Sequence, residues 1–200
     1  RVFYLWQFGV TRQQDAQFGR SFQWDVDLLS GYNYEFVPNI AGEPGPHRFG
    51  GFKNPDLCTR LQAWRPDALL LFGYKWRSHL AAATWARTHG VPVLFRGDSH
   101  FLGRGSPPLF SRLLLRLLFS QFRAFLHVGE ANRRYFLTLG VPPSRLFFTP
   151  HAVNHELFDP AKPAHRAATA NLRRELGIAH RTSIVLFAGK FVPAKQPVEL

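Results

Sequence analysis

The chain has 200 residues and a mass of 22.9 kDa, which is enough for one domain or for one domain and part of a second. Its 46% hydrophobic and 15% aromatic residues exclude a disordered or fibrous protein, and the single cysteine, Cys58, excludes an internal disulfide framework. Lys and Arg number 25 against 13 Asp and Glu, so the net charge is +12. Such an excess predicts an anionic partner, which is a nucleic acid, an acidic membrane surface or a phosphorylated substrate.

Both ends of the sequence are unusual. The chain contains no methionine, and it stops at Leu200, where the pattern predicts the start of a helix. We therefore expect a piece of a longer protein, cut at both ends. No stretch is apolar and uncharged over the roughly 18 residues that a membrane-spanning helix needs.

The first third of the chain predicts little regular structure. Residues 2–6 are apolar and rich in β-formers, which predicts a buried strand, and residues 34–37 predict another. Residues 12–31 show no clear period. The segment 38–55 is rich in Gly and Pro, which predicts a long irregular loop of the kind that often carries function.

From residue 56 onward, strands and helices are expected to alternate. Apolar runs predict strands at 68–72, 92–95, 125–128 and 145–149, and the segments between them predict helices at 56–64, 78–89, 109–124 and 131–139. Gly90 and Gly140 are expected to end two of these helices. This alternation is typical of an α/β, Rossmann-like, doubly wound parallel sheet with both faces covered. Ligands are then expected beyond the strands' carboxyl ends, in the loops after Phe72, Phe95, Val128 and Thr149.

The composition changes near residue 159. Residues 1–158 are expected to form the Rossmann-like domain, and residues 159–177 a linker with a short helix that ends at Gly177. Residues 178–200 are expected to begin a second, truncated Rossmann-like domain with a strand at 183–188.

A glycine and two lysines follow that last strand. Gly189, Lys190 and Lys195 precede an expected helix start, so the two ammonium groups could meet a phosphate there. An ordinary basic turn is the alternative. The segment lacks the spacing and the Ser or Thr of a P-loop.

Three segments, in order, resemble the GT4 family of glycosyltransferases. Residues 127–141, from His127 to Gly140-Val141, are similar to the family's strand and helix that end in Gly-Val. Residues 145–158 resemble its strand followed by Pro-Asn-Gly-Val-Asp and a Phe, although His151-Ala152 replaces Asn-Gly and Asn154 stands where Asp is common. Residues 184–195 resemble its first C-terminal strand and basic loop, with Lys190 where Arg is more usual.

The resemblance implies a GT-B fold and a retaining glycosyltransferase of the hexosyltransferase type, which uses a nucleotide-sugar donor and no bound metal. It implies that Gly189, Lys190 and Lys195 bind the donor diphosphate. The family's Glu-x7-Glu donor motif is expected after Leu200, so these 200 residues are expected to be inactive alone. The acceptor would be a glycan, a lipid-linked molecule or a small molecule, and the protein would be cytoplasmic.

The segment 96–100 supplies the candidate catalytic residues. In the family, the loop at this place often carries a His or an acidic group that faces the acceptor, which implies Asp98 or His100 here, and the sequence does not choose between them. Arg96 and Tyr74, which lie at or just after neighbouring strands, are expected on the acceptor side. Two alternatives remain, namely that Arg96 only pairs with Asp98 to hold the loop, and that Tyr74 only caps the core.

The helix predicted at 109–124 leaves a second question open. Arg112, Arg116 and Arg123 fall within about 40° of each other on its wheel, and almost all its other residues are Leu or Phe. It is either a core helix with one solvated face or a surface that lies on anionic lipid, which would place the protein at the inner face of the membrane.

A basic nucleic-acid-binding module is the main alternative function of the chain, although no nucleic-acid motif occurs and no such partner is expected. A related epimerase or phosphorylase is another.

Overall fold

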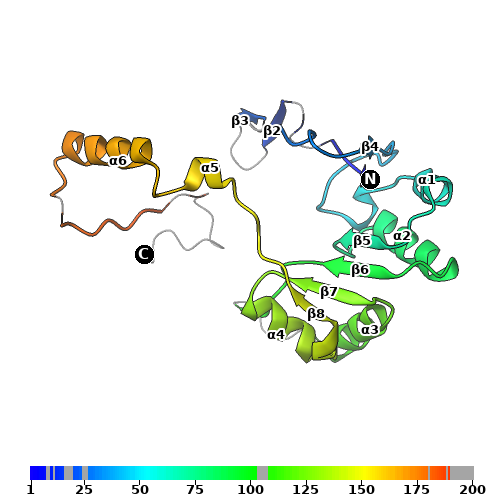
Figure 1. Cartoon of the computed structure of the whole chain (residues 1–200). Coiled ribbons are helices and arrows are strands. Elements are labelled where there is room, and N and C mark those ends of the chain that lie inside the picture. The colour runs from blue at the N-terminus through cyan, green and yellow to red at the C-terminus, as the bar shows by residue number, and fades with distance from the viewer. Residues whose placement is uncertain are drawn as a thin grey trace. The chain divides into compact units, whose positions relative to one another are not determined.

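The computed structural model describes residues 1–7, 10, 12–15, 20–23, 27–102, 108–179, 181–187 and 189. It divides into two compact units, residues 1–151 and residues 152–200 (Figure 1). Each unit is described by itself. The domain boundaries expected from the sequence, after residues 158 and 177, stay a prediction.

The first unit holds an α/β arrangement in which strands and helices alternate from residue 57 onward. Its elements are β1 (Val2–Tyr4), β2 (Gln13–Asp15), β3 (Arg20–Phe22), β4 (Tyr34–Phe36), η1 (Phe49–Gly51), α1 (Leu57–Trp64), β5 (Leu69–Phe72), α2 (Arg77–Thr88), β6 (Val93–Arg96), α3 (Leu109–Ser120), β7 (Ala124–His127), α4 (Glu130–Thr138), η2 (Pro143–Arg145) and β8 (Leu146–Phe148).

Four of these strands form a parallel sheet in the order β5-β6-β7-β8. Its register places Leu71, Phe95, Phe125 and Leu146 in one row across the strands. The helices α2, α3 and α4 connect successive strands, as parallel pairing requires. The predicted α/β, Rossmann-like fold is therefore confirmed.

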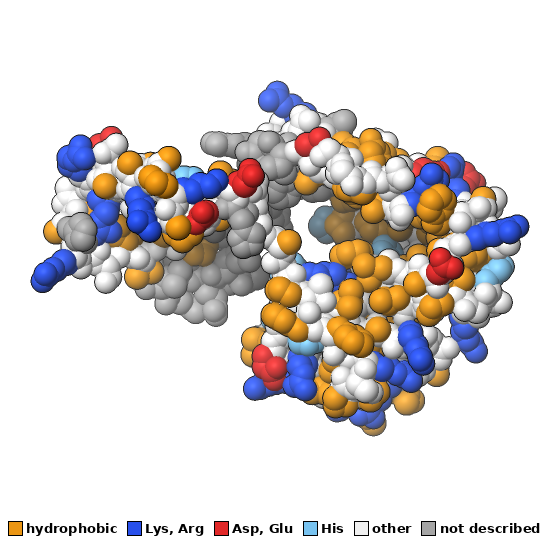
Figure 2. All heavy atoms as spheres, viewed as in Figure 1, with side chains coloured by type: hydrophobic (Ala, Val, Ile, Leu, Met, Phe, Trp, Pro, Cys, Tyr) orange, Lys and Arg blue, Asp and Glu red, His pale blue; other side chains and the backbone are white. Residues whose placement is uncertain are grey.

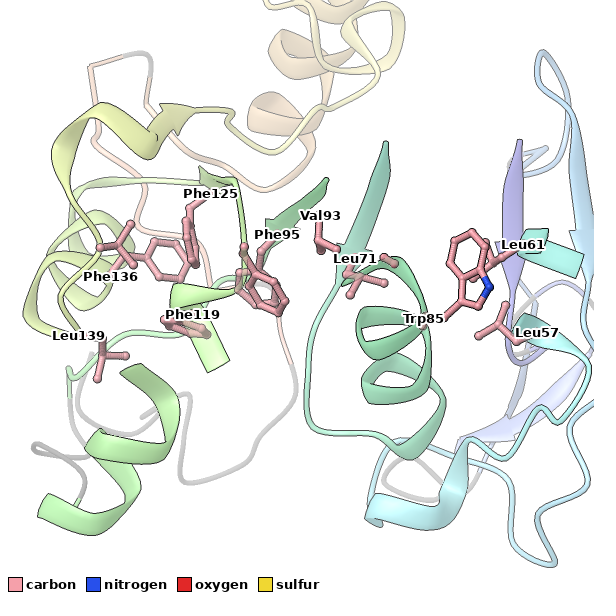
Figure 3. Close-up of a cluster of buried hydrophobic side chains, with 14 of the residues drawn as sticks. Leu57, Leu61, Leu71, Trp85, Val93, Phe95, Phe119, Phe125, Phe136 and Leu139 are labelled. Atoms are coloured by element: carbon pink, nitrogen blue, oxygen red, sulfur yellow. The ribbon is translucent and has the colours of Figure 1, made fainter. Parts of the chain in front are cut away.

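One face of this sheet carries the hydrophobic core. Leu71, Phe95 and Phe125 are 7%, 2% and 0% exposed, and they point to the helix side. The core residues labelled in Figure 3 that come from the helices and the turns beside them are Leu57, Leu61, Trp85, Phe119, Phe136 and Leu139. Aromatic rings dominate this core, which suits the large apolar area that each ring buries.

The opposite face is only partly covered among the described residues. Leu70, Phe72 and Phe147 alternate with the core positions and are 42%, 62% and 52% exposed. The sequence predicted helices on both faces. In this sheet the order of the strands is the same as their order in the chain. Every crossover between neighbouring strands is right-handed, so the connecting helices α2, α3 and α4 all lie on the same face.

The N-terminal strands form separate small sheets. β1 and β4 pair in parallel, with Phe3 opposite Glu35, and they share no ladder with the four-stranded sheet. β2 and β3 form an antiparallel pair that the sequence did not predict. These two strands are three residues long, and no apolar alternation marks Gln13–Asp15 as a strand.

Most predicted boundaries agree with the structure to within one or two residues. The exception is α3, which ends at Ser120 instead of residue 124. The Arg123 amide donates to the Val93 carbonyl at 2.7 Å, so the chain has already joined the sheet there and Arg123 lies outside the helix. Gly90 and Gly140, at φ +70° and +86°, end α2 and α4 as predicted.

The second unit contains α5 (His155–Phe158) and α6 (Pro163–Glu175). The Asn154 side chain caps α5 by accepting from the amides of Glu156 and Leu157. The strand predicted at 183–188 is not formed in its described part, residues 183–187, where Val185 is 83% exposed. A strand needs a partner for its backbone groups, and no described strand pairs with this segment.

Replacing Phe125 with Ala should lower the free energy of unfolding by about 3–5 kcal/mol, because the ring is fully buried among other aromatic rings and its loss leaves a cavity. Urea unfolding followed by circular dichroism measures the change. The control is Phe110→Ala, at a position 71% exposed, which should change stability by less than about 0.5 kcal/mol. Equal losses in both variants would contradict this description of the core.

Candidate functional site at the carboxyl edge of the sheet

The four parallel strands end at the same edge of the sheet, and the loops that follow them gather there (Figure 1). In parallel α/β sheets this edge is where ligands bind. The space-filling view shows the surface of the first unit hollowed near the end of β6 (Figure 2).

Arg96, the last residue of β6, holds two other loops at this edge. Its guanidinium donates to the Thr149 carbonyl at 2.8 Å and to the Pro150 carbonyl at 3.2 Å, and both lie just after β8. Its own carbonyl accepts from the Gly73 amide at 3.1 Å. Arg96 and Asp98 form no ion pair, so the alternative in which they pair is wrong. The guanidinium is directed instead at carbonyl groups 53 and 54 residues away.

Asp98 and His100 lie on a loop that is tied to α4. The Asn132 side chain donates to the Ser99 carbonyl at 2.8 Å and accepts from the Val128 amide at 3.1 Å. Asn132 is 3% exposed, whereas the side chains of Asp98 and His100 face solvent. The loop backbone is thus fixed while both candidate groups remain accessible. Their catalytic roles stay a prediction.

Tyr74 lies at the edge of the core. Its ring centroid is 5.8 Å from that of Phe95 and 5.7 Å from that of Phe119, and its hydroxyl lies 3.5 Å from the Tyr135 hydroxyl. Burial, together with the neighbouring Tyr74 hydroxyl, raises the pKa of Tyr135 well above its ordinary value. Both rings therefore belong to the packing that supports this edge, and a role for Tyr74 toward the acceptor stays a prediction.

His127, the last residue of β7, lies at this edge, and the sequence analysis did not single it out. It is 7% exposed, and its Nδ1 atom has no hydrogen-bond partner among the described residues. Its ring centroid lies 5.5 Å from that of Phe148. A buried ring nitrogen without a partner at a ligand-binding edge makes His127 an additional candidate for a functional residue. The position of His127 near the end of a predicted strand was the feature of the sequence that could have indicated this residue.

A buried polar network fixes the long loop between β4 and α1. The Asn54 amide group donates to the carbonyls of Val37, Leu5 and Pro38 at 2.8, 3.1 and 3.2 Å. The Ser78 hydroxyl lies 2.9 Å from the Asn54 Oδ1 atom and accepts from the Asn54 backbone amide. Because Ser78 belongs to the first turn of α2, this network joins the N-terminal strands and the loop to that helix.

Trp76 joins the same loop to the end of β5. Its indole donates to the Pro46 carbonyl at 3.1 Å, and its ring lies 4.9 Å from Phe52. Gly73 has φ +100°, and a Cβ atom there would come within 2.7 Å of this ring. A glycine is therefore required at the turn after β5.

His79, near the start of α2, is buried behind this turn. Burial lowers the pKa of His79 from its ordinary 6.5 to about 4, and a hydrogen bond to the Phe72 backbone acts in the opposite direction. His79 is therefore neutral at physiological pH and packs as an aromatic residue against Trp76, 5.0 Å between ring centroids.

The predicted diphosphate site falls almost wholly outside the described residues. Lys190 and Lys195 are not among them, and Gly189 is exposed. Where the structure does describe the chain, His, Cys, Asp and Glu side chains do not gather in groups of three or more that could bind a metal ion. None of the described helices is both long enough and apolar enough to cross a membrane.

A parallel α/β sheet with polar loop residues at its carboxyl edge defines a ligand-binding α/β domain of the Rossmann-like class. A family model described as a glycosyl transferase 4-like domain matches residues 11–152, which is more than half of the chain and ends within one residue of the first unit. The chain belongs to this family of glycosyltransferases. No curated protein matches the chain.

Replacing Asn54 with Ala should destabilise the first unit by about 2–3 kcal/mol, because three backbone carbonyls lose their donor and Ser78 loses an acceptor. Urea unfolding provides the measurement. Asn33→Ala is the matched control, since Asn33 is exposed and should give a change within about 0.5 kcal/mol. An Asn54→Ala variant as stable as the wild type would contradict the network.

The stability of the unit should depend on pH through His79. Its folded pKa lies below its unfolded value, so the unfolded state binds more protons between pH 4 and 6.5. The stability that neutral His79 contributes is fully present above pH 6.5. As the pH falls toward 4 it is lost, and the free energy of unfolding decreases by up to about 3 kcal/mol. Urea unfolding at several pH values, compared between wild type and His79→Gln, measures it. The expected result is a flatter pH profile for the variant, and identical profiles would exclude His79 as the source.

Proposed function

We propose that this protein transfers a hexose from a nucleotide-diphosphate sugar to an acceptor with retained anomeric configuration. The observation that carries the proposal is the glycosyl transferase 4-like match over residues 11–152, which coincides with a unit whose described loop residues are hydrogen-bonded at the ligand-binding edge. In this proposal the first unit supplies the acceptor side of the site.

The chemistry assigns separate tasks to the two sides of the site. The bond between the anomeric carbon and the diphosphate oxygen breaks and its electron pair leaves with the diphosphate. The acceptor oxygen forms the new bond to that carbon, and the acceptor hydroxyl would give its proton to a base, for which Asp98 and His100 are the candidates. Lys190 and Lys195, beside Gly189, would bind the diphosphate and stabilise the negative charge that develops on it. These residues require no bound metal in this proposal.

Asp98 or His100 would contact the acceptor and the transferred sugar. Both side chains face solvent on a loop whose backbone Asn132 holds, so either group could approach a bound hydroxyl without rebuilding the loop. Arg96 would act as a positioning residue, because it holds the loop after β8 against the same edge. Tyr74 would support the acceptor side from the edge of the core.

The proposed acceptor belongs to one of three classes of molecule. A glycan, a lipid-linked molecule or a small molecule would each fit an open edge of this kind. We propose a cytoplasmic enzyme, with contact to an anionic membrane at the face described in the next subsection. The 200 residues alone are proposed to lack transferase activity, because the donor side requires more than Gly189, Lys190 and Lys195.

The test is a transfer assay by mass spectrometry with a set of nucleotide sugars and candidate acceptors, run on the full gene product and on the 200-residue chain in parallel. Asp98→Asn or His100→Gln should lower kcat about 100-fold or more, as expected when a group that assists proton transfer is removed. Asp67→Asn, an exposed residue before β5, is the matched control and should stay within about twofold.

Four outcomes would contradict the proposal. Full activity in both Asp98→Asn and His100→Gln would remove these residues from the site. A product of inverted configuration would exclude retention. Release of a sugar phosphate, or epimerisation without transfer, would identify the related phosphorylase or epimerase chemistry instead. Full activity of the 200-residue chain would place the donor site within it.

A further inference from the structure

Helix α3 is apolar on two opposite sides. Leu115, Leu118 and Phe119 face the sheet and join the hydrophobic core. The outward side carries five more large apolar side chains, which are 51–81% exposed: Leu109, Phe110, Leu113, Leu114 and Leu117. We call these five residues the α3 apolar strip.

The strip is continuous on the helix surface. Leu109, Leu113 and Leu117 repeat every four residues, and Phe110 and Leu114 stand beside them, so the five side chains lie within about 140° of the helix circumference. A helix that is apolar around most of its circumference is normally covered on both sides. Exposed apolar side chains gathered in one patch mark a surface that binds something.

Arginine side chains border one side of this strip. Arg112 and Arg116 follow each other along the flank of α3, and the remaining position on that flank is Ser120. Between residues 96 and 145 the chain has eight Arg and only two acidic residues, Asp98 and Glu130. Figure 2 shows Lys and Arg side chains next to hydrophobic ones over the part of the unit where α3 and α4 lie.

A pocket opens beside the same flank. Arg116 and Arg145 line it together with Ser120, and its volume is about 460 Å³. Arg116 donates to the Thr138 carbonyl at 3.3 Å, which holds its guanidinium at the pocket. The other walls are mainly apolar: Phe119, Phe125, Leu139, Gly140, Val141 and Pro142. Two arginines together with mainly apolar walls suit a phosphate group that carries an apolar chain.

We propose that the α3 apolar strip docks on an anionic membrane surface, with Arg116 and Arg145 binding the phosphate of a lipid headgroup. An α-helix of 12 residues is about 18 Å long, so it lies in the interface and does not span the bilayer. The leucines and Phe110 enter the boundary between headgroups and acyl chains while the arginines remain among the headgroups.

Charge favours a membrane over a second copy of the chain as the occupant. Two copies that met through this face would bring Arg112 and Arg116 of one copy toward the same arginines of the other, which opposes association. An anionic surface meets both features at once, since it attracts the arginines and accepts the apolar strip. The inference deepens the proposed function, because it names the surface and the lipid group of the proposed membrane contact, and it rests on that contact but not on the transfer reaction.

Vesicle co-sedimentation with the 200-residue chain tests the proposal. The chain should bind vesicles that contain phosphatidylglycerol at least about tenfold more tightly than vesicles of phosphatidylcholine alone, and about 0.5 M salt should weaken the binding. The double variant Leu113→Ser/Leu117→Ser should bind about tenfold or more weakly, because its apolar contacts are lost. Arg116→Gln/Arg145→Gln should lose most of the preference for anionic lipid.

Matched controls separate the surface from general effects. Leu172→Ser replaces an exposed helical leucine of α6, and Arg87→Gln replaces an exposed arginine of α2, so each should bind within about twofold of the wild type. Thermal unfolding by circular dichroism checks that every variant is folded, which the exposure of the strip leads us to expect.

Three results would overturn the proposal. Equal binding to both kinds of vesicle, or to neither, would exclude an anionic membrane as the occupant. Unchanged binding by folded Leu113→Ser/Leu117→Ser would exclude the strip. A dimer in sedimentation velocity that this double variant abolishes, without vesicle binding by the wild type, would assign the strip to a second copy of the chain. Because the assay measures binding alone, failure of the transfer assay leaves its result unaffected.

Discussion

The packing of Phe95 is the constraint on which the first unit depends. Its ring is 2% exposed and lies 5.4–5.9 Å from the rings of Phe119, Phe122, Phe125 and Phe136. These rings come from α3, the turn after it, β7 and α4, so one side chain joins the elements on the helix side of the sheet. Aromatic contacts of this number stabilise the unit through buried area and edge-to-face geometry. The strand that carries Phe95 then fixes where the ligand-binding edge lies.

The next residue, Arg96, shows how the core positions the site. Successive side chains of a strand point to opposite faces, so the burial of Phe95 on the helix side turns Arg96 to the other face, where it reaches the carbonyls of Thr149 and Pro150. Asn132 and Asn54 hold two further loops in the same way, from buried positions with several hydrogen bonds. Packing determines the position of the edge, and a few buried polar groups determine the position of the loops that surround it.

Prediction from the sequence succeeded where apolar runs were long and regular. The helices and strands from residue 57 to residue 148 were placed closely, because periodicity and terminal glycines such as Gly90 mark them. The β2–β3 pair was missed because its short strands have no apolar alternation. The strand at 183–188 was predicted from its apolar residues and from the family resemblance, yet no described strand pairs with its described part. His127, Asn132 and Asn54 were missed because an isolated polar residue shows its importance only through its neighbours.

The sequence alone determined the fold class, the order of the elements and the resemblance to the GT4 glycosyltransferases, since these depend on local periodicity and on motifs contiguous in the chain. Only the tertiary structure decided which faces are buried. The sequence of α3 is apolar on almost every side, and its contact with the sheet through Leu115 and Phe119 leaves Leu113 and Leu117 in solvent. Likewise, the partners of Arg96 lie more than 50 residues away. Contacts between distant segments depend on how the layers pack, and no local pattern records that packing.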